Sequence, residues 1–224
     1  MKRDGESIIT IDGPSGVGKS TVARRVAELL GFSCLDTGAM YRALALKVNL
    51  AAASPREPEA VSQLLSETTV GFDSEGRVFL DGRDVSELIR TESISSLASE
   101  LAALGEVREF LLGIQRSIGE VGSIVAEGRD MGTYVFPRAR CKFYLDATVE
   151  ERARRRLLQS GRGEASLSDV RSELLLRDSR DTLRANSPLR PASDALIIDT
   201  TSMSAEEVVS SIVLHVKDIS SWGG

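Results

Sequence analysis

Short runs of apolar residues alternate with longer amphipathic stretches along most of the chain. Runs at 7–11, 123–126, 141–145 and 195–198 predict buried strands, and the run at 33–35 predicts a fifth. The stretches between these runs have the spacing of amphipathic helices. Strands that alternate with helices form a parallel sheet covered on both faces, so the pattern predicts an α/β fold.

Local signals mark the boundaries of several helices. Ser54, Thr148 and Ser204 are each followed three positions later by Glu, which is the spacing of a capping box. We therefore expect a helix to begin after each of them. Gly31 is expected to end the first helix, because glycine readily adopts the left-handed conformation found just after a helix.

Two segments interrupt the alternation of strands and helices. Over 70–90, short strand-like pieces are separated by turn residues, which predicts a small antiparallel insertion. The segment 159–166 lacks apolar residues and separates two arginine-rich helices, so we predict a mobile lid over 152–168. No second independent domain is needed, and 1–224 is expected to form one unit.

The charge of the chain bears on its partners. The formal net charge is −5, which argues against binding long polyanions, so nucleic acid is not an expected partner. Only five of the 28 basic residues are lysines, which leaves 23 arginines. Arginine binds phosphate in bidentate geometry, so this surplus fits a protein that holds several phosphates; genome composition explains it equally well.

The remaining composition favours a location inside the cell. No stretch of about 18 apolar residues is present, and the N-terminus lacks the apolar core of a signal peptide, so we expect no membrane partner and a cytoplasmic location. Cys34 and Cys141 each begin an apolar run, which favours buried, reduced thiols over a disulfide or a metal pair. His215, the only histidine, lies in an amphipathic C-terminal pattern that favours a surface or partly packed position.

The strongest local motif is Gly-Pro-Ser-Gly-Val-Gly-Lys-Ser at 13–20, between a predicted strand and a predicted helix. In this Walker A pattern, glycines turn the backbone so that its N–H groups and the helix N-terminus face phosphates. Lys19 is expected to reach the β- and γ-phosphates of ATP, and Ser20 to ligate Mg²⁺. Asp12 and Asp36 are both candidates for a carboxylate that assists Ser20. The residues expected to bind ATP are Gly13, Pro14, Ser15, Gly16, Val17, Gly18, Lys19, Ser20 and Thr21.

Two arginines follow predicted strands, and the carboxyl ends of parallel strands meet at one edge of a sheet. Arg42 follows the second strand, and Arg129 follows the strand at 123–126. Both are therefore expected beside the Walker A loop at 13–20 (the P-loop), where they would meet an anion.

Charged residues in the later helical stretches repeat at helical spacing. Arg177, Asp181 and Arg184 are spaced i, i+4 and i+7, so all three are expected on one face of a helix. A salt-bridged solvent face has the same spacing. Arg152 and Arg156 are four apart on the preceding helix and lead into the predicted lid. Their presence nearby favours a functional role for the charged residues over a salt-bridged solvent face.

Taken together, the motifs resemble the bacterial cytidylate kinases nearly end to end. The matching stretches are the P-loop at 13–20, Asp-Thr-Gly-Ala-Met-Tyr-Arg at 36–42, Glu-Gly-Arg-Asp-Met-Gly-Thr at 127–133 and Arg-Asp-Ser-Arg-Asp at 177–181. The resemblance implies a three-layer P-loop NTPase fold and an ATP-dependent kinase of CMP or dCMP in pyrimidine metabolism. It also implies that the segment 70–104 is the NMP-binding insertion of the bacterial family.

The resemblance also implies roles for single residues. The implied CMP contacts are Thr37, Arg42, Arg129 and Arg184 on the phosphate, Ser99, Arg108 and Asp130 on the base, and Arg177 with Asp181 on the ribose. Thr37 stands where some members have Ser, and both supply a hydroxyl group. The residues expected to act in phosphoryl transfer are Lys19, Arg129, Arg152, Arg156 and Arg184.

Other functions remain open on the sequence alone. One is a P-loop kinase of another small acceptor, such as shikimate or a different nucleotide, and another is a regulator that binds ATP without transferring phosphate. RNA binding through the arginines at 152–156 is a third, opposed by the net charge and by the lack of interleaved aromatic residues. The guanine-binding Asn/Thr-Lys-x-Asp motif of switch GTPases is absent. No long exposed apolar stripe demands a partner chain, so a monomer is expected.

Overall fold

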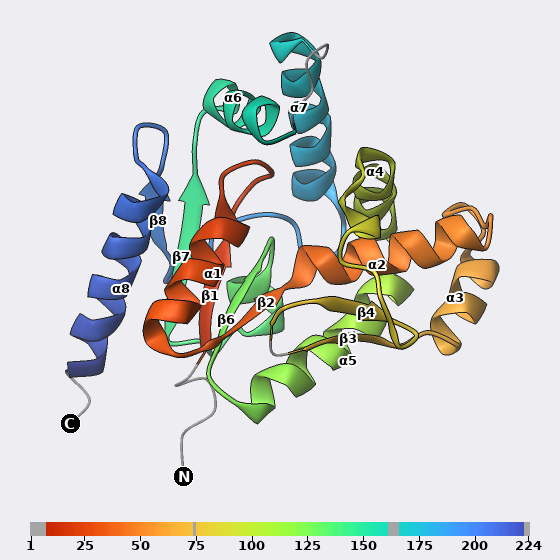
Figure 1. Ribbon diagram of the computed structural model, residues 1–224, viewed down its shortest axis with the longest axis horizontal. Helices are drawn as coiled ribbons and strands as arrows, with labels where there is room; N and C mark the ends of the chain where they lie inside the picture. Colours follow the sequence, from red (N-terminus) through yellow and green to blue (C-terminus); the bar gives the residue numbers. More distant parts are fainter. Residues whose placement is uncertain (1–7, 74, 161–165, 222–224) are drawn as a thin grey trace. The chain divides into compact units, whose positions relative to one another are not determined.

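The computed structural model describes residues 8–73, 75–160 and 166–221 (Figure 1). The chain divides into two compact units, Met1–Cys34 with Gly122–Gly224, and Leu35–Val121. A five-stranded sheet has the order β2-β6-β1-β7-β8, and a separate three-stranded sheet has the order β3-β4-β5. The α/β class that the hydrophobic pattern predicts is confirmed.

The larger sheet contains every strand that the apolar runs predict. Its strands are β1 (Ile8–Asp12), β2 (Ser33–Asp36), β6 (Ile124–Gly128), β7 (Cys141–Asp146) and β8 (Leu196–Asp199). β1 pairs in parallel with β6 and β7, and β7 pairs in parallel with β8. Each strand ends one or two residues later than predicted, because polar residues and a glycine at the carboxyl ends still belong to the strands although the hydrophobic pattern excludes them.

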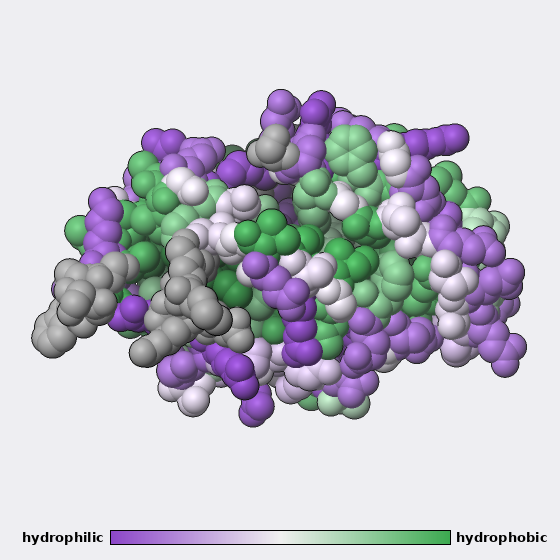
Figure 2. Space-filling view, turned by 90° about the horizontal axis from the view of Figure 1, so that it is seen from below, coloured by the Kyte–Doolittle hydropathy of each residue, from purple (hydrophilic) through white to green (hydrophobic). Residues whose placement is uncertain are grey.

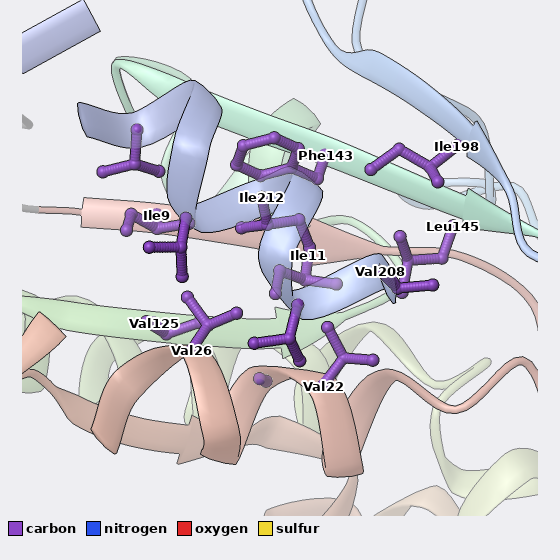
Figure 3. Close-up of a cluster of buried hydrophobic side chains, with 14 of the residues drawn as sticks. Ile9, Ile11, Val22, Val26, Val125, Phe143, Leu145, Ile198, Val208 and Ile212 are labelled. Carbon is purple, nitrogen blue, oxygen red and sulfur yellow. The ribbon is translucent and has the colours of Figure 1, made fainter. Parts of the chain in front are cut away.

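Two helices cover one apolar side of this sheet. α1 (Lys19–Leu30) and α8 (Ala205–Ser221) pack against each other, and Val22, Val26, Val208 and Ile212 point from them into a shared cluster (Figure 3). The strands contribute Ile9, Ile11, Val125, Phe143, Leu145 and Ile198. Burial of one such side chain stabilises the fold by about 1.5–3 kcal/mol. The cluster therefore holds β1 and α1 in place, and the P-loop joins these two elements.

Two further helices follow β7 and pack on each other. They are α6 (Val149–Ser160) and α7 (Leu167–Leu183), which meet through Ala153, Val170 and Leu174. Of the predicted lid at 152–168, residues 161–165 lie outside the described residues, and its mobility stays a prediction.

Three of the four predicted helix signals are confirmed. Gly31 ends α1 with a φ of 68°. Ser204 and Glu207 exchange the two hydrogen bonds of a capping box at the start of α8. α6 begins after Thr148, whose hydroxyl accepts a hydrogen bond from the N–H of Glu151 at 3.4 Å.

The capping box predicted at Ser54 is wrong. α3 (Pro58–Ser66) begins later, with Glu57 at the N-cap position and no side-chain cap hydrogen bond. The hydroxyl of Ser54 instead accepts from the N–H of Arg56 in a local turn. Pro58 explains the later start, because its fixed φ suits the first helical position and its ring disfavours a helical residue before it.

The second unit contains the small antiparallel sheet. Its elements are α2 (Thr37–Leu50), α3, β3 (Val70–Phe72), β4 (Val78–Leu80), β5 (Arg83–Asp84), α4 (Glu92–Leu101) and α5 (Gly105–Val121). The three strands pair in antiparallel fashion, which confirms the insertion predicted at 70–90. The segment 70–104 lies within this unit, and its role in binding a nucleotide stays a prediction.

The cysteines and the histidine pack largely as the sequence favours. Neither cysteine forms a disulfide within the described residues; Cys141 is buried as expected, but Cys34 is only partly buried. The His215 ring meets the Phe143 ring edge-on, with 5.5 Å between the ring centroids. Cys141 and His215 are therefore part of the packing around β7 and α8.

The surface carries both polar and apolar residues, as the face drawn in Figure 2 shows. Large exposed apolar residues include Leu50, Val121, Leu183 and Leu214. Single exposed apolar residues are ordinary on folded proteins. In the described part of the chain, no helix combines the length and the apolar character needed to cross a membrane. A monomeric state and a cytoplasmic location stay predictions.

Candidate active site

The loop between β1 and α1 requires glycine at its first position. Gly13 has a φ of 147°, and a Cβ atom placed on it would lie 2.1 Å from the carbonyl oxygen of Leu145 in β7. The backbone of the P-loop at Gly13 therefore lies in close contact with the backbone of β7. Gly16 and Gly18 also have positive φ values, of 78° and 97°, and Gly18 is the N-cap of α1. The Walker A motif thus has the conformation that its glycines predict.

Lys19 is a buried lysine at the first position of α1. Its Nζ atom donates a hydrogen bond to the carbonyl oxygen of Pro14 at 2.7 Å. The pKa of Lys19 is lowered to about 7, first by burial and then by the positive charge of Arg129, against the opposing charge of Glu127. An anion beside Nζ would favour the charged form and raise this pKa, so the position suits a phosphate.

Ser20 contacts a carboxylate that the sequence analysis did not single out. Its hydroxyl donates to Oε1 of Glu127, which is buried near the end of β6. Asp12 and Asp36, the two carboxylates that the sequence offers as partners of Ser20, have other hydrogen-bond partners. Asp12 accepts backbone N–H groups with both of its oxygens, and Asp36 accepts the N–H of Ala39 at the start of α2. A hydroxyl and a carboxylate are oxygen ligands of the kind that Mg²⁺ prefers, so Ser20 and Glu127 fit this ion.

Arg129, which is partly buried, forms an ion pair with the buried Asp181. Nε of Arg129 donates to Oδ2 of Asp181 in α7 at 2.8 Å. Burial works against the charge of Arg129, but the carboxylates of Asp181, Glu127 and Asp178 together outweigh it, so the pKa of Arg129 is raised. Burial also works against an ionised Asp181, and Arg129, Arg177 and Arg184 together hold the pKa of Asp181 below its ordinary value. Two residues from separate sequence motifs therefore lie in contact, and both are charged at neutral pH.

Asp130 and Arg184 form a second buried pair. Nη2 of Arg184 lies 3.5 Å from Oδ1 of Asp130. Nε of Arg184 donates to the carbonyl oxygen of Ser187 at 2.6 Å, which fixes the plane of the guanidinium group. The loop after β6 thus meets the end of α7 through two arginine–carboxylate contacts.

The helix face predicted for Arg177, Asp181 and Arg184 is confirmed for the first two and wrong for Arg184. α7 ends at Leu183, and Arg184 has an extended backbone with a ψ of 140°. The helix ends here because the sequence Asn-Ser-Pro at 186–188 does not continue a helix. Arg184 reaches Asp130 from the loop instead.

Two arginines of α6 hold the P-loop through its carbonyl groups. Nη1 of Arg152 donates to the carbonyl oxygen of Ser15 at 3.0 Å and to Asp178, and Asp178 accepts the N–H of Ser15 at 3.2 Å. Nη1 of Arg155 donates to the carbonyl oxygen of Val17 at 3.3 Å. These contacts direct two P-loop carbonyl groups toward α6.

In the second unit, two predicted phosphate contacts lie at the start of α2. Thr37 is the first residue of this helix and is buried. Nη2 of Arg42 lies 3.2 Å from Oδ2 of Asp36, the residue that caps the helix. The cap and the arginine are thereby held together at one helix end.

The second unit also contains two predicted base contacts. Arg108 of α5 is buried and donates from Nη1 to the hydroxyl of Tyr41 in α2 at 3.3 Å. Ser99 of α4 is buried, and its hydroxyl has no hydrogen-bond partner within the described residues. Buried polar atoms normally have a partner, so this hydroxyl is suited to contact a polar ligand.

Comparison with known proteins decides the family. The profile of the family described as "Cytidylate kinase" matches residues 9–218 of this chain. The chain belongs to the cytidylate kinase family.

Individual relatives agree with the family match. This member of the cytidylate kinase family is 48% identical to the cytidylate kinase of Carboxydothermus hydrogenoformans over 214 residues, which cover 92% of this chain and 95% of the relative. It is 45% identical to the cytidylate kinase of Syntrophotalea carbinolica over 207 residues, covering 90% of this chain and 88% of the relative. A crystal structure of an uncharacterized protein from Eubacterium ventriosum is similar with a TM-score of 0.52 at 12% identity, covering 95% of this chain and 99% of the other; this likeness concerns the fold alone.

Within this cytidylate kinase family member, the arginines of α6 are placed differently from one another. Arg152 is buried, and its donors face Ser15, Asp178 and the carbonyl oxygen of Ala147, so its contacts shape the P-loop. Arg156 is partly buried on the same helix. A contact of Arg152 or Arg156 with a transferring phosphoryl group stays a prediction. Arg155 was missed because a run of helical arginines does not indicate which one faces the loop.

We expect Arg152→Met to destabilise the protein. Removing one partner of a buried ion pair leaves an uncompensated charge, here on Asp178, and we expect the free energy of unfolding in urea to fall by about 3 kcal/mol. Arg154→Met is the matched control, because Arg154 is exposed and pairs with Glu151 on the same helix. Its effect is expected to stay within about 0.5 kcal/mol. Equal effects of the two substitutions would contradict the role given to Arg152.

Proposed function

We propose that this chain transfers the γ-phosphoryl group of ATP to CMP or dCMP in pyrimidine nucleotide metabolism. The bond between the γ-phosphorus and the oxygen that bridges it to the β-phosphate breaks. A bond forms from an oxygen of the acceptor phosphate to the same phosphorus, which gives ADP and CDP or dCDP. The observation that carries the proposal is the match to the cytidylate kinase family over 9–218 by a chain with an intact P-loop.

The P-loop supports the ATP half of the proposal. A loop of glycine-rich backbone ahead of a helix N-terminus offers N–H groups and a positive dipole end to phosphates. Lys19 adds a cation at the first position of the helix, and Ser20 and Thr21 follow it in the first turn. The proposed ATP contacts are those predicted from the sequence, residues 13–21.

Mg²⁺ is the proposed cofactor, with Ser20 as its expected ligand and Glu127 beside it. Within the ranges that the structure describes, no group of three or more His, Cys, Asp or Glu residues is arranged to hold a metal ion. Mg²⁺ commonly uses few protein ligands and completes its shell with water and substrate phosphates. When bound, it would supply neutralisation of phosphate charge.

The proposed base contacts would favour cytosine over uracil. Cytosine presents a donor at its 4-amino group and acceptors at N3 and O2, so one carboxylate and one guanidinium match its edge. Asp130 and Arg108 are the proposed pair, and Ser99 offers a third polar group. Uracil reverses two of these positions, and each unpaired buried group costs about 1–3 kcal/mol.

Three of the four proposed phosphate contacts are arginines that pair with carboxylates. Thr37, Arg42, Arg129 and Arg184 are the proposed contacts of the acceptor phosphate, and Arg177 with Asp181 those of the ribose. A nucleoside monophosphate is already ionised near neutral pH, so attack needs no general base. The residues contribute by aligning two anions and neutralising their repulsion, the work proposed for Lys19, Arg129, Arg152, Arg156 and Arg184.

A panel of acceptors tests the proposed function. The purified chain is assayed with ATP and Mg²⁺ against CMP, dCMP, UMP, AMP and shikimate, with ADP release as the readout. We expect kcat/KM for CMP or dCMP to exceed that for the other acceptors at least about tenfold. The proposal fails if CMP turns over no faster than UMP or AMP. ATP binding without any product would instead support a regulator, and turnover of shikimate a different kinase.

Asp130→Asn tests the proposed contact with the base. The neutral amide keeps the shape of the side chain but presents a donor as well as an acceptor, so uracil loses its disadvantage. We expect the ratio of kcat/KM for CMP over UMP to fall about tenfold. Asp194→Asn is the matched control, because Asp194 is an exposed partner of Lys142, and the ratio is expected to be unchanged. An unchanged ratio in Asp130→Asn would show that another residue reads the base.

A further inference from the structure

Asp12 is the last residue of β1 and is 3% exposed. Its two carboxylate oxygens accept different backbone N–H groups, Oδ1 from Met131 at 2.9 Å and Oδ2 from Gly132 at 2.8 Å. These N–H groups begin a turn of π-helix, η2 (Met131–Val135). A single carboxylate therefore holds two successive residues of a loop far away in the sequence.

The position of Asp12 continues the pairing of two strands. The parallel ladder between β1 and β6 ends where Asp12 lies opposite Gly128. Beyond this point the chain of β6 carries Arg129 and Asp130, and then the two N–H groups that Asp12 accepts. The side chain of Asp12 thus fixes the loop that presents Arg129 and Asp130, while its own backbone leads directly into Gly13 of the P-loop.

The turn packs so closely on β1 that it has little freedom. A Cβ atom placed on Gly132 would lie 2.9 Å from Oγ1 of Thr10, 3.2 Å from Cδ of Lys142 and 3.4 Å from Oδ2 of Asp12. Any side chain at this position would push the turn away from β1 or displace these groups. The contact between Asp12 and the turn therefore depends on the absence of a side chain at Gly132.

Burying the Asp12 carboxyl costs free energy. Burial raises the pKa of Asp12 to about 6, the N–H groups of Gly132 and Met131 act against this rise, Asp130 adds to it and Lys19 opposes it. The phenol of Tyr144 is also near enough to feel this charge. A serine or threonine hydroxyl would bind one of the two N–H groups without such a cost. An aspartate at this position is explained if both N–H groups must be bound to keep the turn in the position that function requires.

We propose that Asp12 is a positioning residue for the acceptor nucleotide. Through the turn that it binds, Asp12 keeps Arg129 and Asp130 in a fixed position next to the P-loop. The inference rests on the proposed function, because it assigns these two residues to CMP. Asp12 itself touches neither substrate in this account. Its effect is therefore expected to be larger on the binding of CMP than on the binding of ATP, which Asp12 influences only through its charge near Lys19.

The test compares Asp12→Asn with Thr10→Val. The amide of Asn keeps one acceptor oxygen but places an NH₂ group against the second backbone N–H, so the turn is released at one point. We expect the KM for CMP, and its dissociation constant by calorimetry, to rise about tenfold or more, with the KM for ATP within about threefold of wild type. Thr10→Val is the control from the same strand, because the Thr10 hydroxyl is buried and has no hydrogen-bond partner among the described residues. It is expected to leave both KM values unchanged.

A second variant covers the case that Asp12→Asn does not fold. Gly132→Ala disturbs the contact of the same turn with β1 while the chain retains the Asp12 carboxylate, so it is expected to raise the KM for CMP in the same selective way. Equal rises for CMP and ATP, or a loss of kcat with both KM values unchanged, would overturn the proposal. Turnover of CMP by the wild-type chain is measured independently, so a failure of this inference is distinguishable from a failure of the proposed function.

Discussion

The site in the first unit depends on positive charges that lie close together and are buried or partly buried. Lys19, Arg129, Arg177 and Arg184 act electrostatically on the same few residues, and Asp181, Asp130 and Glu127 oppose them. Removing a cation from water costs free energy unless an opposite charge lies beside it. Each of these carboxylates therefore stabilises the cation next to it. Burial, and then the charge of Arg129, lower the pKa of Lys19, and Glu127 offsets this only in part. An anionic ligand would offset it further, which is why the arrangement suits the binding of phosphates.

The backbone of the site is held by side chains that are distant in the sequence. Arg152, Arg155 and Asp178 reach the P-loop from α6 and α7, and Asp12 reaches the turn after β6. The turn after β6 has backbone hydrogen bonds of its own, but these bonds do not tie it to β1. Charged side chains that bond directly to the carbonyl and N–H groups of the P-loop and of this turn supply the missing constraints, at about 1.5–3 kcal/mol for each such bond. The backbone positions of the P-loop and of the turn after β6 are therefore fixed by residues that need not touch a substrate.

The sequence predicts the framework of the fold more completely than the details of the site. The five strands, the antiparallel insertion and the P-loop conformation follow from apolar runs, turn residues and a glycine pattern, all of which act locally. The start of α3 was missed because Pro58 overrides the capping signal at Ser54. Glu127 and Arg155 were missed because their partners, Ser20 and Val17, are more than 100 residues away in the sequence. Only the register of the sheet and the packing of α6 bring these partners together, and no local pattern contains that information.

The claim that the buried cations are set to receive phosphate is tested most directly by proton uptake on ATP binding. At pH 8, a lysine with a pKa of about 7 is mostly neutral, and phosphates beside Lys19 would return it to the charged form. Calorimetric titrations with ATP and Mg²⁺, repeated in buffers of different ionisation enthalpy, count the protons taken up. We expect net proton uptake on ATP binding by the wild-type chain at pH 8, and no comparable uptake by Lys19→Met. Binding of ATP without proton uptake, or the same uptake by Lys19→Met, would contradict this claim.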